Sequence, residues 1–244
     1  YPGVFFSQFT GAELVADKWN LSREDLDEFA LESHQKAANA TESKYFDREI
    51  LPVEGKNAEG INELVLADEG IRFDASLDKL AGLKPVTDGG VITAGNASQI
   101  TDGAAAVMIC NDAGLKKIQS NPRAEIVSIS VVGDDPVFML TGPIPASKKA
   151  LEAAGLSIDD MDLYEVNEAF APVPLAWAHD LEADKSKLNV NGGAMALGHP
   201  LGATGAKLMT TMLHELERRN GNYALQAICE GGGTANATII KRLS

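Results

Sequence analysis

The strongest chemical signal in the sequence is a glycine-rich run from Asn189 to Gly205, with His199 near its middle. Glycine is favoured where the chain turns sharply or comes close to a ligand. Two interpretations are open for this run. It is either a structural turn that contains a histidine, or a rigid loop that presents His199 as a general base.

A second signal is Cys229, which is followed by Glu230 and three glycines, Gly231 to Gly233. A lone cysteine after apolar residues is usually a small core side chain. The glycines favour another interpretation, because they let a substrate pass close to the backbone and leave N–H groups free to stabilise an oxyanion. A thiol beside such a loop can carry protons or attack a carbonyl group.

A third signal is Asn167, the first residue of the segment Asn167-Glu168-Ala169-Phe170. Asparagine at this place either caps a helix or positions a water molecule or a carbonyl group. Both interpretations are open.

These three segments lie next to apolar runs that predict buried strands. The predicted strands are residues 125–132, 163–166, 188–190, 223–229 and 236–241, and they alternate with predicted helices at 146–154, 168–180 and 202–219. Such alternation predicts an α/β fold with helices layered on a mixed sheet. The chemical signals then lie at the carboxyl ends of strands, where open α/β sheets usually bind ligands.

The first part of the chain contains one clear helix, which begins after Ser22 as its N-cap. Its buried stripe is formed by Leu26, Phe29, Ala30, Ser33, Ala37 and Ala40. We expect its other face to meet water through Asp27, Glu28, Glu32 and Lys36. Residues 49–90 are irregular, apart from a short predicted helix at 76–80.

The run from Ala104 to Cys110 predicts a further buried strand, in which Cys110 is a core residue. The remaining histidines, His34, His179 and His214, are predicted on exposed helix faces.

The composition excludes several function classes. The chain has 45% hydrophobic residues, and 21 Lys plus Arg against 35 Asp plus Glu give a net charge of −14, which disfavours nucleic acid and anionic membrane surfaces as partners. Two cysteines make no disulfide framework, and no apolar run reaches membrane-spanning length, so we expect a cytoplasmic location. The chain begins with Tyr1 inside an apolar stretch, so we expect a fragment or a processed product.

Together, the segments Asn167 to Phe170, Asn189 to Gly205 and Cys229 to Gly233 resemble the three C-terminal signatures of the thiolases. Thiolases interconvert a 3-ketoacyl-CoA and a shortened acyl-CoA plus acetyl-CoA. Residues 21–34, 93–98 and 142–147 also resemble thiolase segments, so the similarity covers essentially the whole chain. It implies the layered α/β/α thiolase fold, with residues 1–88 as the CoA-binding loop subdomain, 89–120 as the end of the N-terminal half, and 121–244 as the C-terminal domain.

The resemblance also implies roles for single residues. His199 would be the base that activates the acyl-accepting thiol, Asn167 would hold a water molecule in the first oxyanion hole, and Cys229 would transfer the proton at the α-carbon. The N–H of Gly231 would contribute to the second oxyanion hole. CoA, expected as a substrate, would be bound by Arg72 at its nucleotide end and along its pantetheine arm by Ala94, Ser98 and Phe170. The family implies no tightly bound cofactor, no metal, and a homodimer or homotetramer.

Two departures from the family pattern matter. The first catalytic cysteine of the family, which lies in its N-terminal half, has no counterpart in this sequence, and we expect a missing N-terminal segment to supply it. Ser7-Gln8-Phe9 also stands where many short-chain thiolases carry a His-Met pair, which makes a longer or bulkier acyl chain plausible.

The sequence therefore predicts a thiolase-type acyltransferase that uses a cysteine acyl-enzyme. The alternative is a non-catalytic thiolase-like protein that binds acyl-CoA or lipid. A ketoacyl synthase is a weaker alternative, because those enzymes carry a histidine where Cys229 stands.

Overall fold

The computed structural model describes residues 1, 3, 6–57 and 59–243 and contains a four-stranded mixed sheet. Its strands are β3 (Ala124–Gly133), β4 (Leu163–Val166), β5 (Tyr223–Cys229) and β6 (Thr234–Arg242), in the order β3-β6-β5-β4. β4 runs parallel to β5, and the other neighbours are antiparallel. The predicted mixed sheet is therefore confirmed.

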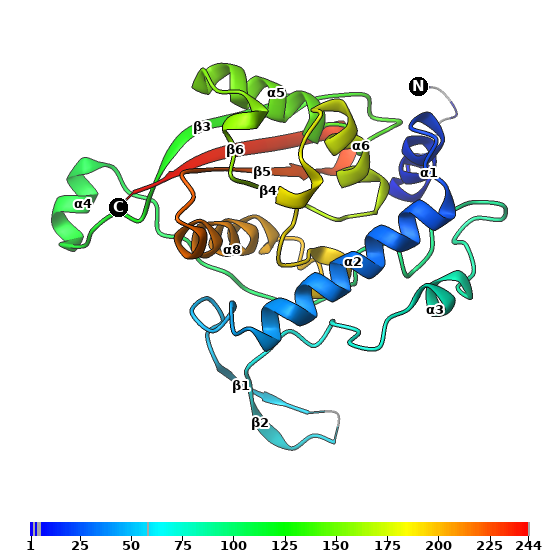
Figure 1. Cartoon of the computed structure of the whole chain (residues 1–244), viewed down its shortest axis with the longest axis horizontal. Helices are drawn as coiled ribbons and strands as arrows, with labels where there is room; N and C mark the ends of the chain where they lie inside the picture. The colour runs from blue at the N-terminus through cyan, green and yellow to red at the C-terminus, as the bar shows by residue number, and fades with distance from the viewer. Residues whose placement is uncertain (2, 4–5, 58, 244) are drawn as a thin grey trace.

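Helices cover both faces of this sheet, as the layered α/β prediction requires (Figure 1). On one face lies α5 (Pro143–Ala154), whose carbonyl groups at Ala146 and Ala150 accept hydrogen bonds from Ser130 and Ser128 of β3. On the other face lies α8 (Thr204–Arg219), where Met212 and Leu216 pack against apolar residues of β4, β5 and β6. The other elements of this half are α6 (Pro172–Asp180), α7 (Ala194–Leu197) and three short 3-10 turns at Ile158–Asp160, Lys185–Lys187 and Gly231–Gly233.

The first part of the chain contains α1 (Gln8–Lys18), α2 (Arg23–Glu42), α3 (Leu77–Ala81) and a hairpin of β1 (Val53–Lys56) and β2 (Asn62–Val65). The predicted helix start is confirmed, because Ser22 and Asp25 form a reciprocal capping box. All six residues of the predicted apolar stripe of α2 are buried. The hairpin was not predicted, and Figure 1 shows it extending away from the sheet.

The exposed face predicted for α2 is wrong at two residues. Asp27 is only 3% exposed, because its carboxylate accepts hydrogen bonds from Arg23 (2.7 Å) and Asn96 (2.9 Å). His34 is also buried, and its Nδ1 accepts a hydrogen bond from the backbone N–H of Arg72 (3.1 Å). In both cases the segment 70–99 covers the helix face that the periodicity predicts to be exposed to solvent.

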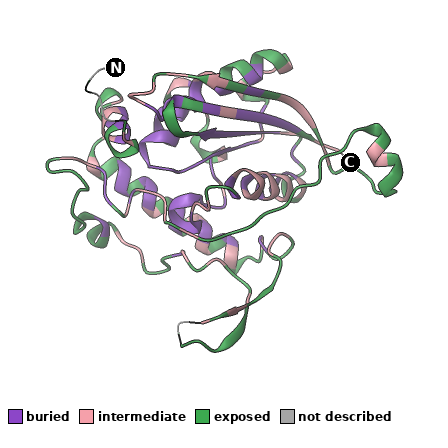
Figure 2. Cartoon of the chain, turned by 180° about the vertical axis from the view of Figure 1, so that it is seen from behind, coloured by how far each residue is buried: buried purple, intermediate pink, exposed green. Residues whose placement is uncertain are grey.

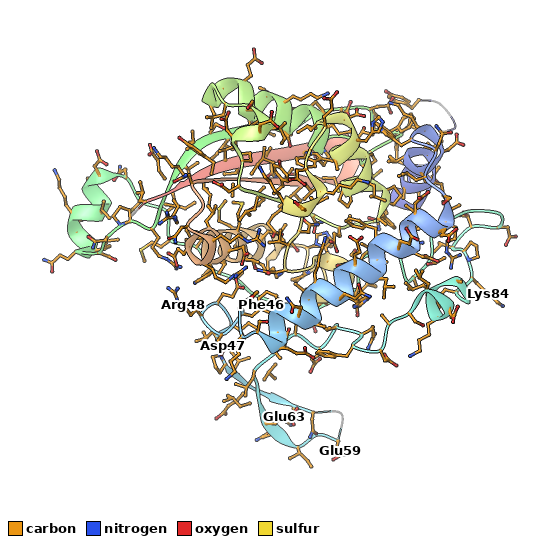
Figure 3. The ribbon with its side chains drawn as sticks, in the orientation of Figure 1. Phe46, Asp47, Arg48, Glu59, Glu63 and Lys84 are labelled. Atoms are coloured by element: carbon orange, nitrogen blue, oxygen red, sulfur yellow. The ribbon has the colours of Figure 1, made fainter. Side chains whose placement is uncertain are left out.

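The solvated face predicted for α8 is wrong for the same kind of reason. The His214 side chain is 10% exposed and lies 3.8 Å from Glu49, on the loop between α2 and β1. On the same loop, Arg48, labelled in Figure 3, pairs with Glu217 of α8 at 3.3 Å. His179, in contrast, is exposed as predicted.

The strand predicted from Ala104 to Cys110 does not form, and the prediction of Cys110 as a core residue is wrong. This segment has no regular structure, Met108 and Ile109 are exposed, and Cys110 is exposed just before α4 (Asp112–Ile118). Among the described residues no strand lies beside it, so its backbone lacks the partners that a buried strand requires. Figure 2 shows exposed residues along this segment, α4 and the hairpin, and buried residues around the sheet.

Two boundaries differ from the prediction next to the chemical signals. α6 begins at Pro172 instead of residue 168, because Phe170 forms a β-bridge with Ala97 and a proline is favoured in the first turn of a helix. The strand predicted at 188–190 is reduced to one bridge between Leu188 and Tyr164.

None of the helices in the described ranges is long and apolar enough to cross a membrane. The division into three domains stays a prediction. One apolar core contains residues of α1 and α2, from the first predicted domain, and residues of the sheet, from the third.

Candidate active site

Asn167 directly follows β4, and its side chain lies next to His199. Its backbone N–H donates to the carbonyl of Ala227 on β5 (3.0 Å), so the parallel pairing continues to this residue. Its Nδ2 lies 3.4 Å from Nε2 of His199. Asn167 does not cap α6, since the residue before that helix is Ala171. Its buried Oδ1 has no hydrogen-bond partner among the described residues, which is unusual and leaves it available to a water molecule or a ligand.

His199 is held by the glycine-rich run that the sequence singled out. Gly198 has φ +86, and a Cβ at this residue would collide with Thr101, so only glycine fits both the conformation and the space. The backbone N–H of His199 donates to the carbonyl of Gln99 (3.0 Å), and its Nδ1 lies 2.7 Å from the hydroxyl of Thr204. Burial lowers the pKa of His199, so the imidazole is neutral, and able to accept a proton, near neutral pH.

Cys229 is the last residue of β5, and its strand is the one that pairs with Asn167. The thiol is buried, and burial raises its pKa to about 12, so it is protonated near neutral pH. The next two glycines, Gly231 and Gly232, leave open space, because a Cβ on either would meet no atom within 4 Å. The structure therefore brings His199, Asn167 and Cys229 to one edge of the sheet.

Glu168 is a buried residue of this site that the sequence analysis did not single out. Its carboxylate accepts hydrogen bonds from the hydroxyl of Ser33 (2.7 Å), the amide of Asn189 (2.9 Å) and the backbone N–H of Met195 (3.1 Å). A Cβ at Gly193 would collide with this carboxylate. Burial raises the pKa of Glu168, while the three hydrogen bonds lower it. Its place beside Asn167, at the end of a buried strand, is the signal that could have identified it.

The residues predicted to bind CoA are only partly brought together. Residues 96–99 lie between the segment after β4 and the histidine loop, by which we mean the glycine-rich run at 189–205. The N–H of Ser98 donates to the carbonyl of Ala169 (3.0 Å), and the N–H of Gln99 donates to the carbonyl of Ala194 (3.4 Å). Ser98 and Phe170 are thus near the site, and Phe170 packs edge to face against Phe9. Ala94 and Arg72 are exposed on loops, with Arg72 adjoining α2 through His34.

The described residues contain a groove of about 790 Å³ elsewhere, between the irregular segment at 106–112, the start of β3 and α8. None of the predicted catalytic residues lines it. The part of the chain that the structure describes holds no group of three or more His, Cys, Asp or Glu residues placed to bind a metal ion. The candidate site is therefore the edge that carries His199, Asn167 and Cys229.

Comparison with known proteins places this geometry in one family. The family described as "Thiolase, C-terminal domain" matches residues 120–242, and "Thiolase, N-terminal domain" matches residues 6–113. The chain is 55% identical over 237 residues to the steroid 3-ketoacyl-CoA thiolase FadA6 of Mycobacterium tuberculosis, covering 97% of this chain and 57% of that protein.

Solved structures agree. The acetyl-CoA acetyltransferase of Bacillus anthracis superposes with a TM-score of 0.93 at 41% identity, covering 99% of this chain and 61% of that one. The human mitochondrial 3-ketoacyl-CoA thiolase in complex with CoA gives a TM-score of 0.89 at 45% identity, covering 96% of this chain and 58% of that one. The chain thus spans about three fifths of the length of these relatives, and the predicted thiolase-like fold is confirmed. On both family matches and on this fold, the chain belongs to the thiolase family.

Proposed function

We propose that this chain is part of a thiolase-type acyltransferase that cleaves a 3-ketoacyl-CoA with CoA, or runs the reverse condensation, through a cysteine acyl-enzyme. The observation that carries the proposal is the contact of His199 with Asn167 beside the end of β5, where Cys229 lies. This chemistry needs three groups at one place. They are a neutral base, an amide with an unpartnered oxygen and a protonated thiol, which His199, Asn167 and Cys229 supply.

In this proposal His199 takes the proton of the acyl-accepting thiol through Nε2, so that the thiolate attacks the 3-keto carbonyl group. The free oxygen of Asn167 holds a water molecule that donates a hydrogen bond to the developing oxyanion. Both roles need a rigid backbone, which the tight turn at Gly198 supplies.

Cys229 then acts as the acid for the leaving group. When the bond between the α-carbon and the 3-keto carbon breaks, the electron pair stays on the α-carbon, and the Cys229 thiol donates its proton there. A thiol with a pKa of about 12 is protonated beforehand, yet is far more acidic than the α-carbon, so the transfer runs towards acetyl-CoA. The second thioester forms when the CoA thiol gives its proton to the Cys229 thiolate and attacks the acyl-enzyme. The bond to the first cysteine breaks, and the released thiolate takes its proton back from His199.

We further propose that CoA binds as a substrate and not as a tightly held cofactor. Arg72, exposed on its loop, would meet the nucleotide phosphates, and Ala94, Ser98 and Phe170 would line the pantetheine arm. A chain with a net charge of −14 needs such local donors to hold an anionic ligand.

The acyl group is proposed to be long or bulky. Ser7-Gln8-Phe9 opens α1 close to Phe170, and the name of the Mycobacterium tuberculosis relative refers to a steroid acyl substrate. We also propose that the protein forms a homodimer or a homotetramer and that it is located in the cytoplasm.

The test uses the complete enzyme, in which an N-terminal segment supplies the acyl-accepting cysteine. The rate of thiolysis of a 3-ketoacyl-CoA is measured as the release of acetyl-CoA by the wild type, His199→Asn and Asn167→Ala. We expect His199→Asn to lose about 10²-fold or more, and Asn167→Ala to lose less. If His199→Asn keeps more than a tenth of the wild-type rate, the turn is structural and the proposal fails.

A second arm separates enzyme from binding protein. The polypeptide 1–244 alone should show no turnover, because Cys229 is committed to proton transfer and the exposed Cys110 lies on a different segment. Adding the N-terminal segment as a separate chain should restore turnover. CoA binding without turnover in the complete protein would favour the non-catalytic alternative.

A further inference from the structure

Thr204 is the first residue of α8, and its buried hydroxyl touches the side of His199 that faces away from Asn167. Its Oγ1 lies 2.7 Å from Nδ1 of His199 and 3.0 Å from the carbonyl of Pro200. On the other side of the ring, Nε2 faces the amide nitrogen of Asn167 at 3.4 Å. The imidazole is therefore held between a hydroxyl group and an amide group.

A threonine hydroxyl has a single proton, which limits how these contacts can be made. If that proton goes to the Pro200 carbonyl, Oγ1 can only accept, and Nδ1 of His199 must carry a proton. Nε2 is then bare and accepts from Asn167, so all three contacts are satisfied. In the opposite arrangement the proton of Nε2 would point at the N–H₂ of Asn167, and two donors would face each other.

We propose that Thr204 is the positioning residue of His199, which holds the ring as the Nδ1–H tautomer and leaves Nε2 free to accept the proton of the reacting thiol. This inference rests on the proposed function for its catalytic consequence, but the tautomer itself belongs to the folded chain. Histidine bases are commonly oriented through the other ring nitrogen in this way.

A neutral partner at Nδ1 has a specific advantage here. A carboxylate would stabilise the imidazolium ion and raise the pKa of His199, whereas a hydroxyl orients the ring without adding charge. Burial is the cause of the lowered pKa of His199, and the positive end of α8, where Thr204 lies, also disfavours a charged ring. The resting state is then a neutral base, ready to accept a proton.

Removing the hydroxyl should leave the turn intact. The Pro200 carbonyl also accepts the backbone N–H groups of Ala203 (2.8 Å) and Thr204 (2.9 Å), so it does not depend on the side chain. Thr204→Val keeps the shape and loses the hydroxyl, and Thr204→Ser restores it. Thr210→Val is the matched control, because the Thr210 hydroxyl bonds back to Ala206 (2.8 Å) on the same helix without touching His199.

The first readout is the ¹⁵N chemical shifts of the imidazole nitrogens in the 244-residue chain, assigned by the signal that disappears in His199→Asn. In the wild type and in Thr204→Ser we expect a pyrrole-type Nδ1 and a pyridine-type Nε2. Thr204→Val should shift towards a mixture of tautomers, and Thr210→Val should match the wild type. A pyridine-type Nδ1 in the wild type, or an unchanged spectrum in Thr204→Val, would overturn the proposal.

The second readout is thiolysis by the complete enzyme. Thr204→Val should lower kcat by about tenfold or more with little change in KM, since the base is misoriented after substrate has bound. Thr204→Ser should recover to within a few-fold of wild type. A loss in Thr204→Val no larger than in Thr210→Val, with equal thermal unfolding midpoints, would contradict the positioning role. If the wild type itself has no thiolysis activity, the proposed function fails, while the ¹⁵N spectra still decide the tautomer.

Discussion

Ser33 of α2 donates a hydrogen bond of 2.7 Å to the buried carboxylate of Glu168, which lies 135 residues later in the chain. The same hydroxyl accepts the backbone N–H of Gly193 (3.0 Å), at the start of the turn that leads to His199. One small side chain thus joins α2, the end of β4 and the histidine loop.

Ser33→Ala should therefore destabilise the chain by about 1–3 kcal/mol, because the N–H of Gly193 loses its acceptor and the carboxylate of Glu168 loses a donor in a buried place. The measurement is urea unfolding of the chain. Ser43→Ala, at the exposed end of α2, is the control and should change stability by less than about 0.5 kcal/mol. Equal small losses in both variants would show that the contact contributes nothing.

Cys229→Ala in the complete enzyme should allow acylation of the first cysteine and stop formation of the carbon–carbon bond, because the two steps use different proton carriers. Intact mass spectrometry should then detect an accumulated acyl-enzyme. Cys110→Ala, which changes the exposed cysteine, serves as the matched control and should behave as wild type. Condensation at the wild-type rate in Cys229→Ala would remove this residue from the mechanism.

Alkylation of the native chain should distinguish its two cysteines. Cys110 is exposed, whereas Cys229 is buried and its pKa is raised to about 12, so little of it is the reactive thiolate. We expect iodoacetamide near neutral pH to modify Cys229 roughly 10²-fold more slowly, as measured by peptide mass spectrometry. In urea both should react readily. Equal rates in the folded chain would contradict the burial of Cys229.

Glu165→Gln should stabilise the chain, and more so at higher pH. Burial raises the pKa of Glu165 to about 8, with Lys207 lowering it and the carboxylates of Glu168, Glu49 and Glu215 raising it, and its Oε1 has no hydrogen-bond partner among the described residues. The unfolded chain ionises this group near pH ~4.3. The folded state therefore loses stability as the pH rises from that value to about 8, and the loss is constant above it.

The measurement is urea unfolding of Glu165→Gln and wild type between about pH 5 and pH 9. The stability difference should grow by a few kcal/mol up to about pH 8 and then level off. Glu152→Gln, exposed on α5, is the control and should change stability by less than about 0.5 kcal/mol. A difference for Glu165→Gln that is constant with pH would show that its carboxyl group ionises normally in the folded state.

The sequence predicted the interior of the sheet well. β4 and β5 have the predicted bounds, because short apolar runs between turns leave few alternatives, and the start of α2 is specified by a local pair, Ser22 and Asp25. His199, Asn167 and Cys229 could also be found, because each stands beside glycines or at the end of such a strand.

The sequence could not predict which polar helix faces are buried by segments that are distant in the chain. Periodicity identifies the apolar face of a helix, but it does not show that a distant segment packs on the polar face. For this reason Asp27 and His34 are buried and His214 is partly buried. Cys110 is the converse case, since an apolar run predicts a buried strand only where neighbouring strands exist. The partners of Glu168 lie 21 to 135 residues away, so they depend on tertiary contacts, whereas Thr204 and His199 are only five residues apart.

The bond between Ser33 and the backbone of Gly193 spans 160 residues, and this has a consequence for biosynthesis. At an ordinary rate of translation, Gly193 is added roughly ten to thirty seconds after Ser33. During that time the capping box favours a helical α2, while Ala37 and Ala40 of its apolar stripe still lack Ala196 and Leu197 of α7, with which they cluster. A ribosome that pauses before residue 193 therefore presents α2 with the C-terminal part of its apolar stripe incompletely covered, the kind of apolar surface that chaperones bind.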